Sequence, residues 1–204
     1  MKTILLASHN PAKIRRYRAL FKGISGLELT TLADISITHK PDEPFKTAKD
    51  NAVHKAKEYG DLTGLPTLAI DEAVTANFLP DNEQPGVMVR RLNGGRELSD
   101  EEVIDAWKEI LGRYPGPDRQ VIWDYWVAYY EPKTGLIRTA QSIQRSRVAD
   151  YFSPVLNPGY PMSRFLISEG HTRTYSELSE EERQELDRRN LTPFRDLMIE
   201  IMKV

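Results

Sequence analysis

The chain has 204 residues, of which 40% are hydrophobic and 28% charged, a composition typical of a folded domain rather than a disordered one. It has no cysteine, which excludes disulfides, thiolate metal sites and a cysteine nucleophile. The net charge is −2, so we expect binding to neither nucleic acid nor a membrane surface. The apolar opening at 4–7 is too short for a signal peptide or a membrane span, and a soluble cytoplasmic protein is expected.

The first third of the chain alternates between short apolar runs and amphipathic stretches. Three apolar runs are predicted to be buried strands, and they lie at 3–7, 27–32 and 67–70. After the first of them, Asn10 is suited to cap a helix that starts at Pro11, because the missing N–H of proline costs nothing at that position. A second helix is predicted over 47–59. This alternation argues for an α/β sheet.

The rest of the chain predicts further helices and a pair of long strands. Ser99 and Glu102 form a capping box ahead of an apolar stripe that is typical of an amphipathic helix. Two β-rich stretches are joined by a hairpin-like turn at Gly135, and they lie at 120–130 and 136–148. The predicted starts of two late helices are Ser179 and Thr192.

The turn after the first strand has the character of an anion-binding helix start. The segment Ser8-His9-Asn10-Pro11-Ala12-Lys13 presents helix N–H groups, with Ser8 and Asn10 as side-chain donors and Lys13 one turn further on. It lacks the glycines of a P-loop or a Rossmann turn. Taken alone, the motif is more typical of an ordinary capped helix with a solvated lysine.

Three acidic residues, Glu43, Asp50 and Asp71, form a second candidate site. Asp71 is predicted to end a buried strand, the position at which open α/β sheets bind ligands. Hard carboxylate oxygens suit Mg²⁺, which one or two carboxylates hold together with substrate phosphates. Such a site also orients and deprotonates a water molecule. Glu43 and Asp50 are also compatible with ordinary surface charges, and by composition alone the two interpretations are even for Glu43.

Four arginines near the C-terminus form the third candidate, and they are Arg183, Arg188, Arg189 and Arg195. Guanidinium groups bind phosphate bidentately and stack on bases. The helix that carries most of them is rich in glutamate, so solvated ion pairs within the helix explain most of them more simply. The four histidines show no metal-ligand spacing, and His54 is expected to have no partner.

Taken in chain order, these motifs resemble the inosine triphosphate pyrophosphatase family. The opening ILLASHNPAKIRRYRAL is similar to the strand, [ST]-x-N-x-x-K turn and helix of that family. Glu43 with TAKDNAVHKAK, and then TGLPTLAIDEAV, match its acidic segment and the strand that ends in Asp-Asp-Ser/Thr. Pro85-Gly86 with Arg91, Gly170, TYSEL and SEEER follow the same order. The resemblance spans nearly the whole chain and is strongest before residue 92.

The resemblance implies hydrolysis of a nucleoside triphosphate to the monophosphate and pyrophosphate, by attack of water at the α-phosphorus with Mg²⁺ as cofactor. It implies Glu43 and Asp71 as metal ligands, with Asp71 also the base for the water. Lys13 and Lys55 are the implied catalytic cations that neutralise phosphate charge. By position, the implied substrate contacts are Ser8, His9, Asn10, Lys13, Glu72, Tyr160, Ser163, Arg183, Arg188 and Arg189.

The chain departs from the family most where the family reads the base. Ile70-Asp71-Glu72 replaces Asp-Asp-Ser, so one carboxylate is moved or lost. The base-recognition motif Phe-Gly-Tyr-Asp-Pro falls on 160–164, Ser-His-Arg falls on 187–189, and Arg183 replaces a lysine. A site that hydrogen-bonds one base edge rejects analogues that leave its polar groups unpaired. We therefore hypothesise that the chemistry is retained on a non-standard or modified purine, with a base or sugar preference other than inosine or xanthosine.

The implied fold is α/β, with a long mixed central β-sheet flanked by helices, two lobes around an active-site cleft, and residues 1–204 as a single domain. A homodimer is also implied, and the aromatic strand at 123–130 offers apolar surface for it, whereas a buried core strand explains most of those residues more simply. The alternative function is a catalytically weak relative that binds a nucleotide as a sensor or regulatory protein. The sequence leaves open whether Glu72 replaces the carboxylate missing at Ile70.

Overall fold

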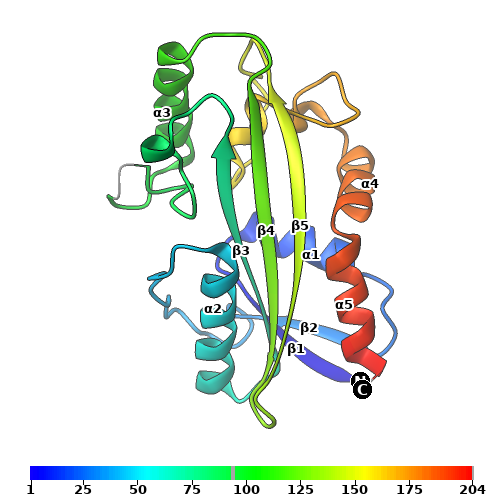
Figure 1. Ribbon diagram of the computed structural model, residues 1–204. Helices are drawn as coiled ribbons and strands as arrows, with labels where there is room; N and C mark the ends of the chain where they lie inside the picture. Colours follow the sequence, from blue (N-terminus) through cyan, green and yellow to red (C-terminus); the bar gives the residue numbers. More distant parts are fainter. Residues whose placement is uncertain (93–94, 204) are drawn as a thin grey trace. The chain divides into compact units, whose positions relative to one another are not determined.

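A mixed sheet runs through the computed structural model, which describes residues 1–92 and 95–203 (Figure 1). In these ranges six strands have the order β2-β1-β3-β4-β5-β6. They are β1 (Lys2–Ala7), β2 (Leu27–Thr31), β3 (Thr67–Ala76), β4 (Gln120–Glu131), β5 (Leu136–Val148) and β6 (Leu166–Ser168). Strand β1 is parallel to both β2 and β3, whereas β6 is antiparallel to β5. The predicted mixed α/β sheet is confirmed.

Five α-helices accompany the sheet within the described ranges. They are α1 (Pro11–Phe21), α2 (Ala48–Thr63), α3 (Asp100–Arg113), α4 (Glu180–Asn190) and α5 (Thr192–Lys203). Short 3₁₀ helices lie at η1 (Asp81–Glu83), η2 (Pro161–Arg164) and η3 (Tyr175–Glu177). Every predicted helix and strand is present. The sequence did not predict β6 or the 3₁₀ helices, because elements of three or four residues are too short to show a hydrophobic period.

The chain divides into two compact units. The first unit comprises Met1–Glu72, Tyr125–Ser142 and Gln184–Val204, and the second comprises Ala73–Asp124 and Ile143–Arg183. The boundaries fall inside β3, β4, β5 and α4. Each unit is therefore assembled from segments that are distant in sequence. The cleft between two lobes stays a prediction.

In the first unit, α2 packs closely against the sheet because its inner face is built from small residues. Ala52 and Ala56 are buried in a cluster that includes residues of β1 and β4. A methyl group at Gly60 would lie only 2.6 Å from Cδ1 of Tyr130, so this helix position requires glycine. Close packing of α2 fixes the helix that carries Lys55.

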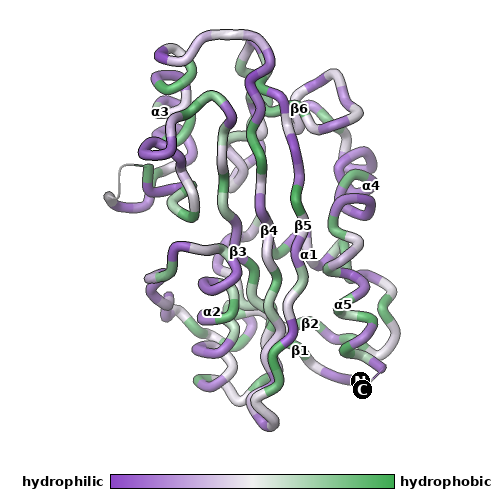
Figure 2. The backbone as a smooth tube through the Cα atoms, in the orientation of Figure 1, coloured by the Kyte–Doolittle hydropathy of each residue, from purple (hydrophilic) through white to green (hydrophobic). Residues whose placement is uncertain are grey.

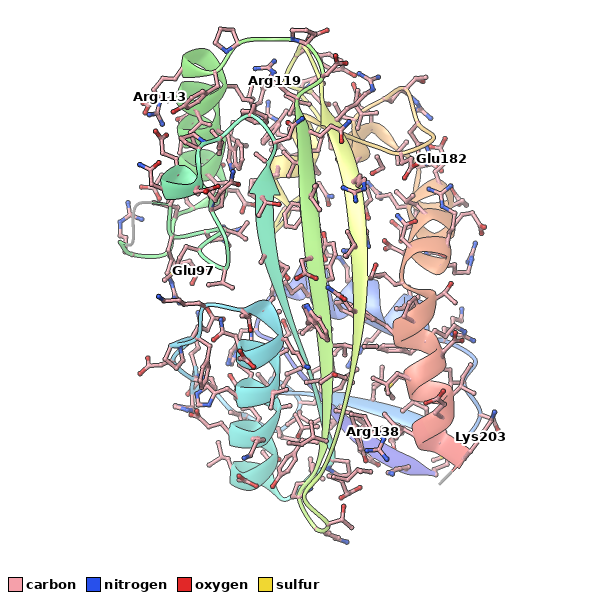
Figure 3. All side chains as sticks on the ribbon, viewed as in Figure 1. Glu97, Arg113, Arg119, Arg138, Glu182 and Lys203 are labelled. Carbon is pink, nitrogen blue, oxygen red and sulfur yellow. The ribbon has the colours of Figure 1, made fainter. Side chains whose placement is uncertain are left out.

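In the second unit, α3 buries the predicted apolar stripe. Val103 and Trp107 are fully buried, and the ring centroids of Trp107 and Phe165 lie 5.5 Å apart. Figure 2 shows hydrophobic and hydrophilic residues recurring in turn along this helix. Near its end, Arg113 points outward and forms an ion pair with Glu83 at 3.0 Å (Figure 3). The helix is therefore amphipathic, as its sequence period predicts.

The aromatic residues of β4 belong mainly to the protein core. Tyr125, Tyr129 and Tyr130 are at most 8% exposed, and Trp123 and Trp126 are half-buried. The interpretation of this stretch as a core strand is therefore correct for most of its residues. The strand offers little apolar surface to a partner subunit, and the homodimer stays a prediction.

The two late helices begin at the predicted positions, and the start of α4 is capped. The Ser179 hydroxyl accepts the Glu182 N–H at 3.2 Å, and the Glu182 carboxylate accepts the Ser179 N–H at 2.7 Å. Helix α4 is almost entirely hydrophilic (Figure 2), whereas α5 buries Phe194 and Met198. Within residues 1–92 and 95–203, no helix combines the length and the apolar character needed to cross a membrane.

The cap of α3 makes part of the stability depend on pH. Ser99 and Glu102 form the predicted capping box, and Arg96 also bonds the Glu102 carboxylate. The hydrogen bond from Arg96 and the backbone bond from Ser99 lower the pKa of Glu102 to about 2, from an ordinary value of 4.5. This carboxylate therefore stabilises the fold above pH 4.5, and its contribution is lost as the pH falls from 4.5 toward 2.

We expect Glu102→Gln to make the free energy of unfolding depend less on pH below about pH 4.5. The amide oxygen still accepts the Ser99 N–H, but the charge that attracts Arg96 is gone. Urea midpoints measured between about pH 3 and pH 7 give the profile. Glu101→Gln, at the exposed neighbouring position, is the matched control. Equal acid-side slopes for Glu102→Gln and the unmodified chain would contradict this role of the cap.

Candidate active site

The turn between β1 and α1 has the predicted capped geometry. The Asn10 side chain accepts the N–H groups of Ala12 at 2.9 Å and Lys13 at 3.4 Å. The Ser8 hydroxyl oxygen accepts the Asn10 N–H at 3.1 Å, and Pro11 has no N–H. The first amides of α1 are thus bonded inside the turn. An anion at this position would depend on the Lys13 ammonium more than on helix N–H groups.

Asp71 lies inside β3 and not at its end. The strand continues to Ala76, so the prediction that it ends at Asp71-Glu72 is wrong. The parallel neighbour β1 does end here, because its last residue Ala7 pairs with Ala69. Asp71 is 7% exposed and lies just beyond the carboxyl end of β1, where the turn to α1 begins. The ligand-binding edge of the parallel sheet is therefore defined by β1 rather than by β3.

Lys55 joins two acidic residues that are far apart in sequence. Its Nζ lies 3.1 Å from Oε1 of Glu43 and 2.9 Å from Oδ1 of Asp71. The side chains of Lys55, Asp71 and Glu43 are 12%, 9% and 29% exposed. Glu43 comes from the connection between β2 and α2, Lys55 from α2 and Asp71 from β3. We call these three residues the Lys55 cluster, in which both predicted metal ligands surround one cation.

Asp50 is not part of the Lys55 cluster. The Thr47 hydroxyl donates to the Asp50 carboxylate at 2.6 Å and accepts the Asp50 N–H at 3.1 Å. These two bonds cap the start of α2, where Thr47 is the N-cap residue. Asp50 is therefore a helix-capping residue.

A second ion pair joins Lys13 to Glu72. The Lys13 Nζ lies 2.5 Å from Oε2 of Glu72, and each side chain is 17% exposed. Burial disfavours the charge on Lys13, but the carboxylates of Glu72, Asp71 and Glu43 outweigh burial and raise the pKa of Lys13. Lys13 is thus a firmly protonated cation facing three carboxylates. Glu72 pairs with Lys13 and does not join Glu43 and Asp71 on Lys55.

The negative charge of Asp71 is disfavoured by burial. Burial raises the pKa of its carboxyl, although Lys55 and Lys13 act in the opposite direction. Its Oδ1 contacts Lys55, whereas its buried Oδ2 has no hydrogen-bond partner among the described residues. A buried carboxylate oxygen left without a partner is costly, and such atoms are usually bonded by a ligand, an ion or water.

The Lys55 cluster has the donor chemistry that a magnesium ion uses. Glu43 and Asp71 supply hard carboxylate oxygens around a single positive charge, and Oδ2 of Asp71 lacks a partner among the described residues. Residues 1–92 and 95–203 contain no group of three or more His, Cys, Asp or Glu side chains that could hold a metal. Mg²⁺ needs no such group, because it is commonly held by one or two carboxylates together with waters and substrate phosphates.

His9 contacts α2 and the connection between β2 and α2. Its Nε2 lies 2.9 Å from the His39 carbonyl oxygen and 3.1 Å from the Tyr59 hydroxyl, so the ring that was predicted to contact substrate is already bonded. His54 lies 3.2 Å from Glu58, one turn along α2, and the expectation that it has no partner is wrong. Their four-residue spacing is the signal that was overlooked.

Asn51 is a residue of this region whose role the sequence analysis missed. It is fully buried, and its side-chain amide accepts the Phe45 N–H and donates to the Phe45 carbonyl, both at 3.0 Å. These bonds fix the chain two residues after Glu43. A polar residue among the alanines on the buried face of α2 is the available signal, because buried amides are almost always bonded.

Three of the predicted base-reading residues lie in the second unit. Tyr160 is half-buried, and Ser163 is 7% exposed with its hydroxyl donating to the Tyr160 carbonyl at 2.5 Å. Arg183 forms an ion pair with Glu180 at 3.2 Å. The hydroxyl hydrogen of Ser163 is therefore already used in a hydrogen bond within the protein.

The remaining arginines lie in the first unit. Arg188 pairs with a glutamate of its own helix at 2.7 Å, and Arg189 donates to the side chain of the next residue at 3.2 Å. The adjacent Asp187 is buried and binds Arg16 of α1 at 2.5 Å. Arg195 donates to two carbonyls at the end of α1 and is a helix-capping residue. Of the four arginines of the third candidate, Arg195 is thus engaged at the end of α1.

Comparison with known proteins places the chain in a family. The model of the Ham1 family matches residues 4–193. A dITP/XTP pyrophosphatase of Leptospira interrogans is 33% identical over 100 residues, which cover 49% of this chain and 49% of the relative. The chain thus spans about half the length of that curated relative. A dITP/XTP pyrophosphatase of Gluconobacter oxydans is 29% identical over 193 residues, which cover 94% of this chain and 88% of the relative.

A solved structure shows the same fold. The HAM1 protein of Coxiella burnetii superposes with a TM-score of 0.79 at 24% sequence identity, covering 100% of this chain and 99% of that one. The family resemblance drawn from the sequence motifs is confirmed by the family match, and the predicted fold class by this superposition.

Proposed function

This chain belongs to the Ham1 family, and on that premise we propose that it hydrolyses a nucleoside triphosphate to the nucleoside monophosphate and pyrophosphate. Its relatives in Leptospira interrogans and Gluconobacter oxydans are named dITP/XTP pyrophosphatases. The observation that carries the proposal is the Lys55 cluster, in which one ammonium joins Glu43 to the buried Asp71. A triphosphate substrate requires cations and a base in one place, and this cluster with Lys13 supplies both.

Each residue of the site has a chemical role in this proposal. Lys13 and Lys55 neutralise the charge of the triphosphate, and Ser8 lies in the turn beside Lys13. The Asp71 carboxylate takes a proton from the attacking water. The water oxygen forms a bond to the α-phosphorus as the bond from that phosphorus to the bridging oxygen breaks. Pyrophosphate leaves with the electron pair of that bond.

A divalent metal fits the same residues. Glu43 and Asp71 would hold Mg²⁺, because they are paired hard carboxylates and Oδ2 of Asp71 is unsatisfied among the described residues. When bound, the ion supplies Lewis-acid stabilisation of the charge on the phosphate oxygens. The protein itself positions Glu43. Lys55 bonds the Glu43 carboxylate, Asn51 bonds the backbone of Phe45, and both belong to α2.

The residues at the base-reading positions support a preference that differs from inosine and xanthosine. Ser163 replaces an acid expected from the family pattern, and its hydroxyl already bonds the Tyr160 carbonyl. Asp187 is engaged with Arg16, and Arg188 is exposed. A base edge that needs the family's acid or histidine would leave polar groups unpaired here.

The direct test is pyrophosphate release over a panel of standard and modified nucleoside and deoxynucleoside triphosphates, with and without Mg²⁺. We expect metal-dependent release that is selective for a few members of the panel. Release that is uniform across the panel, or clearly selective for inosine, would contradict the altered preference. Nucleotide binding by calorimetry without any release would favour the alternative function, a nucleotide-binding regulatory protein.

Glu43→Gln is the matched variant for the metal role. The amide keeps the size of the side chain but loses the negative charge, and we expect the Mg²⁺ concentration for half-maximal release to rise by about tenfold to a hundredfold. Asp42→Asn removes the same charge from the adjacent exposed position and is expected to leave this concentration unchanged. Equal Mg²⁺ dependence of the two variants would refute the role of Glu43.

A further inference from the structure

The segment that carries Glu43 is a long connection that must be held in place. Residues 32–47 join β2 to α2 and contain no regular helix or strand. Connections of this length in compact domains are uncommon and usually functional. Glu43 itself is bonded to Lys55, but an ion pair at a partly exposed side chain does not by itself fix a backbone path. The other contacts of this connection therefore decide where Glu43 lies.

One face of α2 holds the connection at regular intervals. Asn51, Lys55 and Tyr59 are spaced by four residues and so share a face of the helix. Asn51 bonds the backbone of residue 45 through both its amide atoms, and Lys55 bonds Glu43. The Tyr59 hydroxyl donates to the carbonyl of residue 39 at 2.8 Å. The connection thus runs back along the helix and is bonded at every turn.

His9 adds a second bond to the same carbonyl. Its Nε2 lies 2.9 Å from the carbonyl oxygen of His39 and 3.1 Å from the Tyr59 hydroxyl. A carbonyl oxygen only accepts hydrogen bonds, so this contact requires a hydrogen on Nε2 of His9. The rings of His9 and Tyr59 also meet edge to face, with centroids 6.2 Å apart. His9 therefore ties the turn that carries Lys13 to the connection that carries Glu43.

We propose that His9 and Tyr59 are positioning residues that together hold the connection carrying Glu43 against the turn between β1 and α1, which carries Lys13. In this role His9 helps to place the metal ligand Glu43 and is not a substrate ligand. This inference rests on the proposed function only for its consequence in catalysis. The clasp itself, defined as His9, Tyr59 and the His39 carbonyl, is a property of the free protein.

The clasp makes two linked predictions for His9→Ala and Tyr59→Phe. Amide exchange over residues 38–46 of the free protein is expected to become faster by about threefold to tenfold, the size expected for loss of one hydrogen bond. Because His9 and the Tyr59 hydroxyl also contact each other, removing either one weakens the bond of the other, and the double variant is expected to show less than the product of the two single effects. His9→Gln, whose amide nitrogen can donate in place of Nε2, is expected to restore much of the protection.

In catalysis, we expect the two variants to change the dependence of pyrophosphate release on Mg²⁺. In both variants the Mg²⁺ concentration for half-maximal release rises by about the same factor, while KM for the nucleotide at saturating Mg²⁺ is unchanged. Tyr130→Phe is the matched control, because it removes a hydroxyl that donates to Asp61 at 2.7 Å and lies outside the clasp. We expect it to leave exchange over 38–46 and the Mg²⁺ dependence unchanged.

Two outcomes would overturn the proposal. Unchanged exchange over 38–46 in His9→Ala shows that the ring does not hold the connection. A raised KM for the nucleotide at saturating Mg²⁺ in His9→Ala shows that His9 is a substrate ligand instead. If the unmodified protein releases no pyrophosphate from any nucleotide, the proposed function fails, and the exchange measurement on the free protein still decides the clasp.

Discussion

We expect Asp71→Asn to lower kcat for pyrophosphate release by about 10²- to 10⁴-fold, the usual range for loss of a general base. The amide cannot take a proton from water, and it presents no negative charge to Mg²⁺. KM for the nucleotide is expected to change much less, because Lys13 remains to bind phosphate. Steady-state pyrophosphate release at saturating Mg²⁺ separates the two parameters.

The same substitution is expected to leave the free protein at least as stable as before. Burial raises the pKa of Asp71, which means that its charged form is less favourable in the folded chain than in the unfolded one. A neutral amide removes that penalty. Catalytic charges held against burial commonly trade stability for activity in this way. Thermal unfolding at neutral pH measures the effect, and we expect no decrease in Tm.

Asp105→Asn is the matched control for Asp71→Asn. It removes the same charge from a side chain that is 71% exposed on α3 and pairs only with its neighbour Lys108 among the contacts of the described residues. We expect activity and stability close to those of the unmodified protein. A loss of activity in Asp71→Asn that is accompanied by unfolding would remove the support for a role as base.

Local features of the fold were predictable because they depend on residues close in sequence. The Asn10 cap with Pro11 and the Ser99–Glu102 capping box appear as predicted, since each is complete within one helical turn. The end of β3 was not predictable in this way. Two acidic residues interrupt its apolar pattern, but the neighbouring strand ends at Ala7 and leaves room for a charged side chain at Asp71.

The site itself depends on contacts that no local pattern reveals. Glu43, Lys55 and Asp71 were selected from the sequence by resemblance, and only the packing of α2 on the sheet shows that one ammonium bonds both carboxylates. The pairing of Glu72 with Lys13 and the contacts of His9 are of the same kind. Lys55 bonds residues 12 and 16 positions away, and His9 bonds a carbonyl 30 positions away. None of these separations is a helix or strand period, so spacing along the chain carries no signal for them.

Lys55→Met is expected to have the second large effect, on stability as well as on activity. Removing the ammonium leaves Glu43 and Asp71 facing each other without the cation that lies between them. Breaking a buried ion pair by removing one partner costs about 3–5 kcal/mol, and because Glu43 is 29% exposed we expect a loss of about 2–3 kcal/mol at neutral pH. Lys57→Met, on the exposed side of the same helix, is expected to change stability by about 0.5 kcal/mol or less.

The pH dependence of this loss identifies its source. Lys55 is the strongest of the groups that lower the pKa of Asp71, so without it the pKa of that carboxyl rises further. A raised carboxyl pKa favours the folded state at low pH, and the benefit disappears as the pH rises through the folded-state pKa. The destabilisation by Lys55→Met is therefore expected to shrink as the pH falls. Urea midpoints of both lysine variants over a pH series measure it.

Magnesium alone provides the decisive comparison for Lys55→Met. If Glu43 and Asp71 form a cation site, Mg²⁺ without nucleotide raises the stability of Lys55→Met more than that of the unmodified chain, because the competing ammonium is gone. Lys57→Met, which retains Lys55, should respond as the unmodified chain does. Equal responses of all three proteins would show that the two carboxylates do not bind the metal, whatever their part in the ion pair.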